Sequence, residues 1–186
     1  MRKEITIYFS HKEKTMEEHS AAVTMKGNPL TLLGNMPKVG QTAPDAELLD
    51  NSLAPVQISS YKGKVIIISS VPSLDTPVCD IETRRFNTEA GSLGPDVVIL
   101  TISMDLPFAQ KRWCGAAGID RVVTLSDHRS AEFGKLYGTL IQELRLLARA
   151  VFVVDREGIV QYVQLVKEIA QEPDYAGVLD AARRLI

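Results

Sequence analysis

Two side chains of this sequence can carry redox chemistry on their own, namely those of Cys79 and Cys114. A thiolate sulfur is a strong nucleophile that can be oxidised stepwise and then reduced by another thiol. Two cysteines are too few for a disulfide-stabilised scaffold, and their spacing matches neither a Cys-x-x-Cys motif nor a zinc-ligand pattern. Each cysteine is therefore either a core thiol or a reactive one.

The residues before Cys79 place it at the start of a helix. Thr76 is a good N-cap residue, and Pro77 suits the first helical position because that position needs no amide hydrogen. Cys79 then occupies the third position, where free backbone N–H groups and the helix dipole stabilise a thiolate. A small buried hydrophobe is the commonest role of a free cysteine, so position alone leaves both interpretations open.

Four segments of the chain match, in order, motifs of one enzyme family. Residues 72–79 (PSLDTPVC) contain the Pro-x-x-x-Thr-x-x-Cys signature and resemble the thiol peroxidase branch of the peroxiredoxins. Residues 105–115 (DLPFAQKRWCG) are similar to the resolving-cysteine helix of that branch, and residues 147–151 (LARAV) to its arginine-bearing segment. Residues 172–175 (EPDY) also recur there. The resemblance, to the atypical two-cysteine type, extends from about residue 22 to the C-terminus.

The resemblance implies a thioredoxin-like fold and assigns a role to each matched residue. Cys79 becomes the peroxidatic nucleophile and Cys114 the resolving cysteine. Thr76 forms a hydrogen bond at the reacting sulfur, Arg149 holds the thiolate and the peroxide, and Pro72 shields the pocket from water. A hydroxyl in the first helical turn reaches the sulfur, and a guanidinium supplies several fixed donors. No metal or cofactor is expected, because sulfur undergoes the redox change.

The implied activity is the reduction of hydrogen peroxide and organic hydroperoxides. Cys79 would form a sulfenic acid, Cys114 of the same chain would form a disulfide with it, and thioredoxin or a similar dithiol would reduce that disulfide. The resemblance also implies a homodimer with the pocket near its interface. A rival interpretation is a non-catalytic peroxide sensor with a thioredoxin fold. A thioredoxin-like disulfide reductase is disfavoured, because it normally needs a Cys-x-x-Cys pair.

Two of these residues also have ordinary structural interpretations. Thr76 can serve as a helix cap, and an arginine that opens an apolar strand, as Arg149 does, is most often a surface residue whose stem packs on its neighbours. Trp113, next to Cys114, is assigned to packing rather than to chemistry.

Strand and helix patterns alternate along the chain. Residues 23–33 predict an entry hairpin around Gly27 and Asn28. Apolar and amphipathic runs predict strands at 65–71, 97–102, 122–125, 150–154 and 159–165, with helices at 76–91, 107–117, 130–137 and from 173 onward. On the first helix, Val78, Ile81, Phe86 and Ala90 should share the buried face. We therefore expect an α/β protein whose central mixed β-sheet is flanked by helices.

Composition limits the partners and the organisation. The 186 residues are 45% hydrophobic and 24% charged, with a net charge of −2, so the chain is one ordinary domain with no positive excess for nucleic acid or membrane. Residues 1–21 lack periodicity and are expected to form a mobile N-terminal extension, followed by the peroxiredoxin-like domain at 22–186. No signal peptide is evident, so the cytoplasm is the expected compartment.

Overall fold

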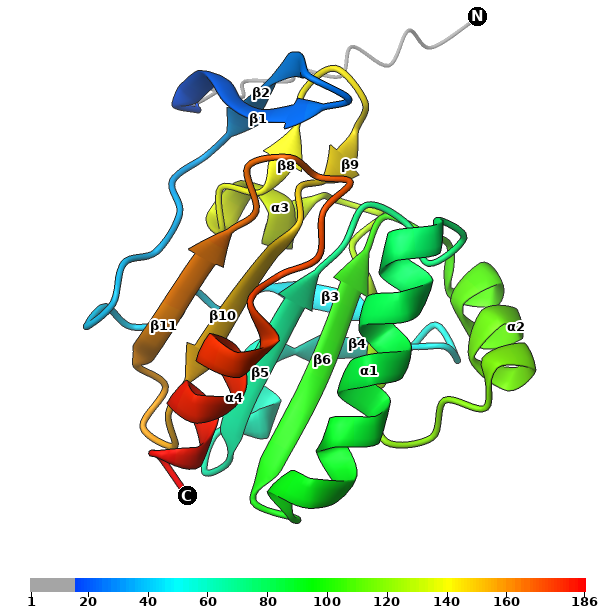
Figure 1. Cartoon of the computed structure of the whole chain (residues 1–186), viewed down its shortest axis with the longest axis vertical. Coiled ribbons are helices and arrows are strands. Elements are labelled where there is room, and N and C mark those ends of the chain that lie inside the picture. Colours follow the sequence, from blue (N-terminus) through cyan, green and yellow to red (C-terminus); the bar gives the residue numbers. More distant parts are fainter. Residues whose placement is uncertain (1–15) are drawn as a thin grey trace, which may run out of the picture.

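The computed structural model describes residues 16–186 and is built around a seven-stranded sheet (Figure 1). Its strands run in the order β11-β10-β5-β6-β7-β3-β4. Their bounds are β3 (Glu47–Leu49), β4 (Pro55–Gln57), β5 (Val65–Ser70), β6 (Val97–Ser103), β7 (Val123–Ser126), β10 (Ala150–Val154) and β11 (Val160–Leu165). The long predicted strands are confirmed to within about a residue, whereas β3 and β4 lie in a stretch with no strand pattern.

The sheet is mixed, as predicted. Strands β5, β6 and β7 pair in parallel, while β10 runs antiparallel to both β5 and β11. Every residue of β5 and β10 is buried, which explains their continuous apolar runs, because a strand covered on both faces has no solvent side to alternate with. The loop that follows β5 therefore starts from a fixed position.

Helices cover the sheet on both faces. They are α1 (Pro77–Leu93), α2 (Pro107–Ala117), α3 (Glu132–Leu136) and α4 (Tyr175–Arg183), with a 3₁₀ turn at Ile58–Tyr61. Phe86 of α1 and Val178 of α4 pack on one side of the sheet, and Phe133 of α3 packs on the other. In Figure 1, α1 and α2 lie side by side. Over residues 16–186, no helix has the length and apolarity that a membrane crossing requires.

The buried face of α1 differs from the predicted one. Its buried residues include Cys79, Glu82 and Phe86, whereas Ile81 is 49% exposed, so the prediction that Ile81 faces the core was wrong. An apolar pattern could not anticipate this rotation, because a buried ion pair places the polar Glu82 on the inner face. The first turn of α1 is thus oriented by charge as well as by apolar contacts.

A second sheet contains the predicted hairpin. Its strands are β1 (Glu18–Met25), β2 (Asn28–Leu33), β8 (Leu140–Ile141) and β9 (Leu146–Leu147), in that order. The hairpin is confirmed, and β1 begins at Glu18 with a register irregularity between His19 and Val23. The mobile extension predicted for residues 1–21 lies mostly outside the described residues, which begin at residue 16. Strand β1 includes residues 18–21, and the boundary at residue 22 stays a prediction.

Candidate active site

Cys79 lies where the sequence predicts it, at the third residue of α1. Thr76 adopts the extended N-cap conformation and Pro77 is the first helical residue. The preceding loop leaves the buried end of β5, so a rigid strand and a helix start fix the sulfur between them. The Cys79 side chain is completely buried and contacts Val71 and Leu74 in a small apolar cluster.

The Thr76 hydroxyl serves the sulfur rather than the helix. Its Oγ1 lies 2.8 Å from Cys79 Sγ and 2.9 Å from the Ser73 carbonyl oxygen. The hydroxyl caps no backbone N–H of α1, so Thr76 is the N-cap residue by backbone conformation only. Because a hydroxyl has a single proton, it can donate to the sulfur when Cys79 is a thiolate and to Ser73 otherwise.

Arg149 supplies a second donor to the same sulfur. Its Nη2 lies 3.3 Å from Cys79 Sγ and its Nε donates to the Ile169 carbonyl oxygen at 3.0 Å. The side chain is 1% exposed, so the surface interpretation of this arginine was wrong. Burial tends to lower the pKa of Arg149, but the nearby charges of Glu82 and Cys79 outweigh it, and the net direction is upward. The guanidinium is therefore a permanent cation beside the sulfur.

Glu82 is a component of the site that sequence reasoning missed. It forms a fully buried ion pair with Arg149 Nη1, and Ser69 Oγ of β5 donates to its Oε1 at 2.6 Å. These contacts fix the rotation of the guanidinium toward Cys79. A signal was present in the sequence, since Glu82 follows Cys79 by three residues and must share its helix face.

The loop before Cys79 is also held by residues at the end of β6. The Asp105 carboxylate accepts hydrogen bonds from Ser73 Oγ at 2.7 Å, from the Leu74 backbone N–H at 2.8 Å, and from Ser103 Oγ at 2.8 Å. Two consecutive residues of the loop are thus tied to the residues that follow β6. The loop before Cys79 is held from both β5 and β6.

A cavity of about 350 Å³ opens beside these donors. Thr76, Arg149 and the buried Pro72 line one part of it. The remaining lining is mostly apolar and comes from the tip of the β1–β2 hairpin, the first turn of α1 and the loop after β11: Met25, Lys26, Pro77, Val78, Ile169 and Ala170. The cavity therefore combines two polar donors with a mostly apolar lining that forms its entrance side at Met25 and Lys26 of the hairpin tip.

Glu168 attaches the hairpin tip to this entrance. Its carboxylate accepts from the backbone N–H groups of Lys26 at 3.0 Å and Gly27 at 3.1 Å, and from Thr24 Oγ1 at 2.9 Å. The Gly27 amide, with the other donors, lowers the pKa of Glu168 to about 2. The carboxylate stays ionised at neutral pH and holds one wall of the cavity.

Cys114 lies on α2, in a different environment. It is partly buried, and its Sγ lies 3.4 Å from Thr124 Oγ1 of β7. Both thiols are free. The structure thus brings Thr76, Arg149 and Pro72 together around Cys79, whereas Cys114 faces another strand.

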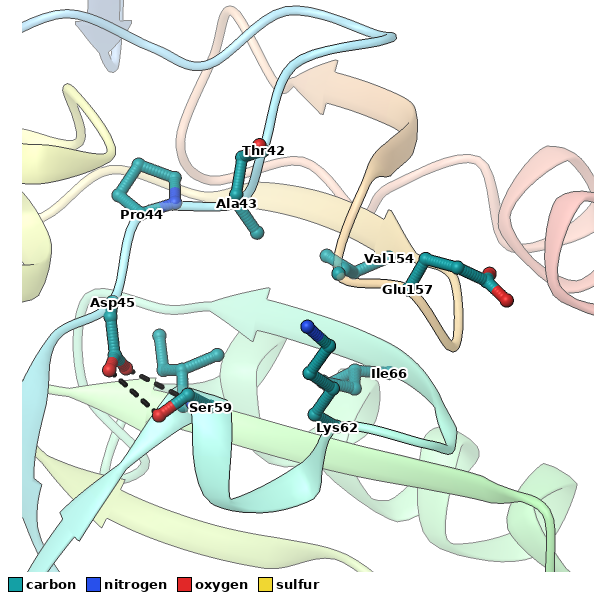
Figure 2. A pocket seen from close by; sticks show the side chains of 11 residues that line it. Thr42, Ala43, Pro44, Asp45, Ser59, Lys62, Ile66, Val154 and Glu157 are labelled. Atoms are coloured by element: carbon teal, nitrogen blue, oxygen red, sulfur yellow. Dashed lines mark hydrogen bonds between the residues drawn. The ribbon is translucent and has the colours of Figure 1, made fainter.

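A separate cavity of about 180 Å³ lies between the 3₁₀ turn and the loops at residues 42–45 and 157–158 (Figure 2). Figure 2 shows the Asp45 carboxylate bonded to Ser59, while Lys62, Ile66 and Val154 also line the cavity. Its lining includes neither Thr76 nor Arg149, the two residues that bond to Cys79 Sγ. The cavity lined by Thr76 and Arg149 is therefore the one that adjoins the Cys79 thiol.

Comparisons with known proteins show the family to which the chain belongs. The Redoxin family model matches residues 38–179. Thiol peroxidase of Oceanobacillus iheyensis is 60% identical over 84% of this chain and 95% of its own length, and thiol peroxidase of Bacillus subtilis is 55% identical over 89% and 99%. The crystal structure of a peroxiredoxin-like protein from Aquifex aeolicus superposes with a TM-score of 0.83 at 45% identity, covering 90% of this chain and 99% of that one. With a buried cysteine held by a threonine and an arginine on a thioredoxin-like sheet, the chain belongs to the thiol peroxidase branch of the peroxiredoxins.

Proposed function

We propose that this thiol peroxidase uses Cys79 as its peroxidatic nucleophile and Cys114 as its resolving cysteine. The observation that carries the proposal is the convergence of Thr76 Oγ1 and Arg149 Nη2 on one buried sulfur, at 2.8 and 3.3 Å. Both groups also line the adjoining cavity, so they can contact a peroxide that enters it. A merely structural cysteine needs neither a fixed cation nor a cavity.

In the first step, the Cys79 thiolate attacks the terminal oxygen of the peroxide. A sulfur–oxygen bond forms, the oxygen–oxygen bond breaks, and the leaving hydroxide or alkoxide takes up a proton to become water or an alcohol. Negative charge moves from the sulfur to the leaving oxygen. Arg149 and Thr76 are positioned to stabilise the negative charge that develops on the leaving oxygen, and fixed donors lower the barrier in this way.

In the second step, the Cys114 thiolate attacks the Cys79 sulfenic acid. A sulfur–sulfur bond forms, the sulfur–oxygen bond breaks, and hydroxide leaves as water after protonation. A dithiol reductant of the thioredoxin type then exchanges with the disulfide and restores both thiols. Within the protein, only sulfur changes its oxidation state, while the peroxide oxygens are reduced.

The cavity supports organic hydroperoxides as substrates in addition to hydrogen peroxide. Hydrogen peroxide needs only the two polar donors at the base. The apolar residues above them, such as Met25 and Ile169, can accept an alkyl group, because burial of apolar surface is favourable. Pro72 limits water access at the base, and it has no N–H to compete for the peroxide.

We propose a homodimer as the working assembly, with the site near its interface. Leu106 and Phe108 support a covered surface near the active-site loop, because they are 53% and 64% exposed in the single chain. Sedimentation at micromolar concentration checks this, and a monomer would contradict it. The peroxidase domain is proposed to span residues 22–186, and the compartment is proposed to be the cytoplasm, where thiols remain reduced.

Thioredoxin-coupled oxidation of NADPH, measured with hydrogen peroxide and with a series of alkyl hydroperoxides, tests the function. Sustained turnover is expected, and a single stoichiometric oxidation without turnover would instead indicate a sensor. The intact mass after one equivalent of peroxide should fall by about two units, the two hydrogens lost in an intrachain disulfide. A covalent dimer through Cys79 would contradict the assignment of Cys114.

A further inference from the structure

Three side chains join the helix of Cys79 to the helix of Cys114. Trp113 Nε1 of α2 donates to Asp80 Oδ1 of α1 at 3.2 Å, and Arg84 Nε of α1 donates to Asp80 Oδ2 at 2.9 Å. The Arg84 guanidinium also lies 5.8 Å from the Trp113 ring centre, a cation–π arrangement. We call Asp80, Arg84 and Trp113 the α1–α2 clamp.

Arg84 extends the clamp to the far end of α2. Its Nη1 donates to the Ala117 carbonyl oxygen at 2.9 Å, and that carbonyl belongs to the last turn of α2, where helical partners are missing. The clamp therefore holds α2 on both sides of Cys114, through Trp113 before it and Ala117 after it. Asp80, in turn, directly follows Cys79 in the sequence.

The clamp opposes the movement that the second chemical step requires. A disulfide needs the two Cα atoms within about 7 Å and the two Cβ atoms pointing toward each other. Cys79 is buried beneath the first turn of α1, while Cys114 Sγ faces Thr124 on β7. The first turn of α1, or α2, must leave its place before the sulfurs meet, and either motion separates Asp80 from Trp113.

We propose that the α1–α2 clamp sets the rate at which Cys114 reaches oxidised Cys79, so that Asp80, Arg84 and Trp113 are positioning residues for the resolving step. This inference rests on the proposed roles of the two cysteines. The clamp holds α2 against α1, and it thereby delays disulfide formation.

The delay has a chemical consequence, because the Cys79 sulfenic acid has two possible reactions. Attack by Cys114 forms the disulfide and releases hydroxide. Alternatively, the sulfenate attacks a second peroxide, the oxygen–oxygen bond breaks, and sulfur is oxidised further to a sulfinic acid while water or alcohol leaves. A weaker clamp speeds the first reaction only, so less enzyme is lost as sulfinic acid when peroxide is in excess.

Arg84→Gln is the principal test, with Arg183→Gln as its matched control. The two arginines are 48% and 50% exposed, and each pairs with a carboxylate of α1, Asp80 for Arg84 and Glu89 for Arg183. Arg183 lies on α4 rather than beside α2, so the control makes the same charge change without touching the clamp. Trp113→Phe is a second variant that keeps an aromatic ring and removes the N–H donor together with the pyrrole part of the indole.

Rapid quenching with a thiol-blocking reagent, followed by intact-mass analysis, measures sulfenic acid, disulfide and sulfinic acid over time. In Arg84→Gln, disulfide formation should accelerate about three- to tenfold and the sulfinic yield at excess peroxide should fall by a similar factor. The rate of the first oxidation should stay the same. Trp113→Phe should raise the ratio of disulfide to sulfinic acid by a smaller factor, and Arg183→Gln should leave that ratio unchanged.

Trp113 is the single tryptophan of the chain, so its fluorescence reports on the clamp directly. In wild type, a fluorescence change should coincide with disulfide formation, and in Arg84→Gln that phase should become faster. Equal or slower disulfide formation in Arg84→Gln, or an equal acceleration in Arg183→Gln, would overturn the clamp. If wild type itself forms no Cys79–Cys114 disulfide, the proposed function fails and the clamp fails with it.

Discussion

The two cysteines lie in opposite kinds of environment. Cys79 is fully buried at a helix start, where Thr76 and Arg149 both reach its sulfur. Cys114 is partly buried inside a helix, and its sulfur lies 3.4 Å from the hydroxyl of Thr124. The Cys79 thiol is surrounded by fixed hydrogen-bond donors, whereas the Cys114 thiol faces a different strand and lies apart from them.

This difference follows from what each step requires. Attack on a peroxide gains from donors fixed before the reaction, because no free energy is then spent on reorganising them. Disulfide formation instead needs a displacement, so a strongly held resolving thiol would be slow. The predictions below test whether the contacts of Cys79 set the rate of its reaction with peroxide, and whether those of Cys114 mainly hold its helix in place.

Cys79→Ser should have the largest effect and reduce peroxide turnover to the background rate. Serine is nearly isosteric and keeps the helix start, so the far-ultraviolet circular dichroism and the thermal midpoint should change little. The thioredoxin-coupled assay measures the loss. Substantial turnover by this variant would remove Cys79 from the mechanism.

Cys114→Ser should separate the two steps. The first oxidation of Cys79 should proceed at the wild-type rate, while thioredoxin-coupled turnover is lost and sulfenic and then sulfinic acid accumulate under excess peroxide. Stopped-flow oxidation with intact-mass analysis follows both. Full turnover by Cys114→Ser would show that another group resolves the sulfenic acid.

Arg149→Met should slow the oxidation of Cys79 by about two to three orders of magnitude, because it removes a donor from the reacting sulfur. It should also destabilise the fold by about 3–5 kcal/mol, since Glu82 is left buried without its partner. Arg149→Lys is the control, because it keeps the positive charge and loses the planar set of guanidinium N–H donors. Wild-type oxidation kinetics in Arg149→Met would make the arginine purely structural.

A matched pair of hydroxyl deletions compares the two sulfurs directly. Thr76→Val should slow the first oxidation about 10- to 100-fold, the effect of losing a hydrogen bond to a charged group. Thr124→Val should change the rate of disulfide formation less than about threefold, because its contact with Cys114 Sγ is long and made to a neutral thiol. Similar effects in both variants would contradict the distinction between the two environments.

The last prediction concerns stability rather than turnover, at a carboxylate that follows β7, the strand contacting Cys114. Burial raises the pKa of Asp127 from 3.8 to about 6, despite hydrogen bonds from the Phe133 and Gly134 backbone N–H groups. A raised folded-state pKa contributes stability that is present below about pH 4 and is lost as the pH rises through 6. Glu82, beside Cys79, has Arg149 as a buried partner instead.

Urea unfolding of wild type and Asp127→Asn between pH 7 and pH 4 measures this contribution. The stability of wild type relative to the variant should rise on acidification by up to about 3 kcal/mol, since each pKa unit corresponds to about 1.4 kcal/mol. A pH-independent difference between the two proteins would show that Asp127 is not held as an unpaired buried carboxylate.

Local sequence determined a large part of the fold and the position of the nucleophile. The continuous apolar runs of β5, β6 and β10 and the Thr76-Pro77 helix start depend on backbone preferences and short-range contacts, which a single segment contains. Cys79 at the third position of α1 follows from those alone. The family motifs added Arg149, Cys114 and Pro72 as candidates but could not give their surroundings.

Tertiary structure alone decided how those residues are held. Arg149 lies 70 positions from Cys79 and 67 from Glu82, so no local pattern could show that the three side chains share one buried site. The two-residue strands β8 and β9 depend on pairing, because β8 pairs with the edge of β2 and β9 pairs with β8. The clamp of Asp80, Arg84 and Trp113 joins two helices that are separate in sequence. The hydrogen bonds of the clamp and the Arg149–Glu82 ion pair form only after the sheet and helices have brought distant polar groups together. In the buried ion pair no water can replace a lost partner, so each charged group needs the other.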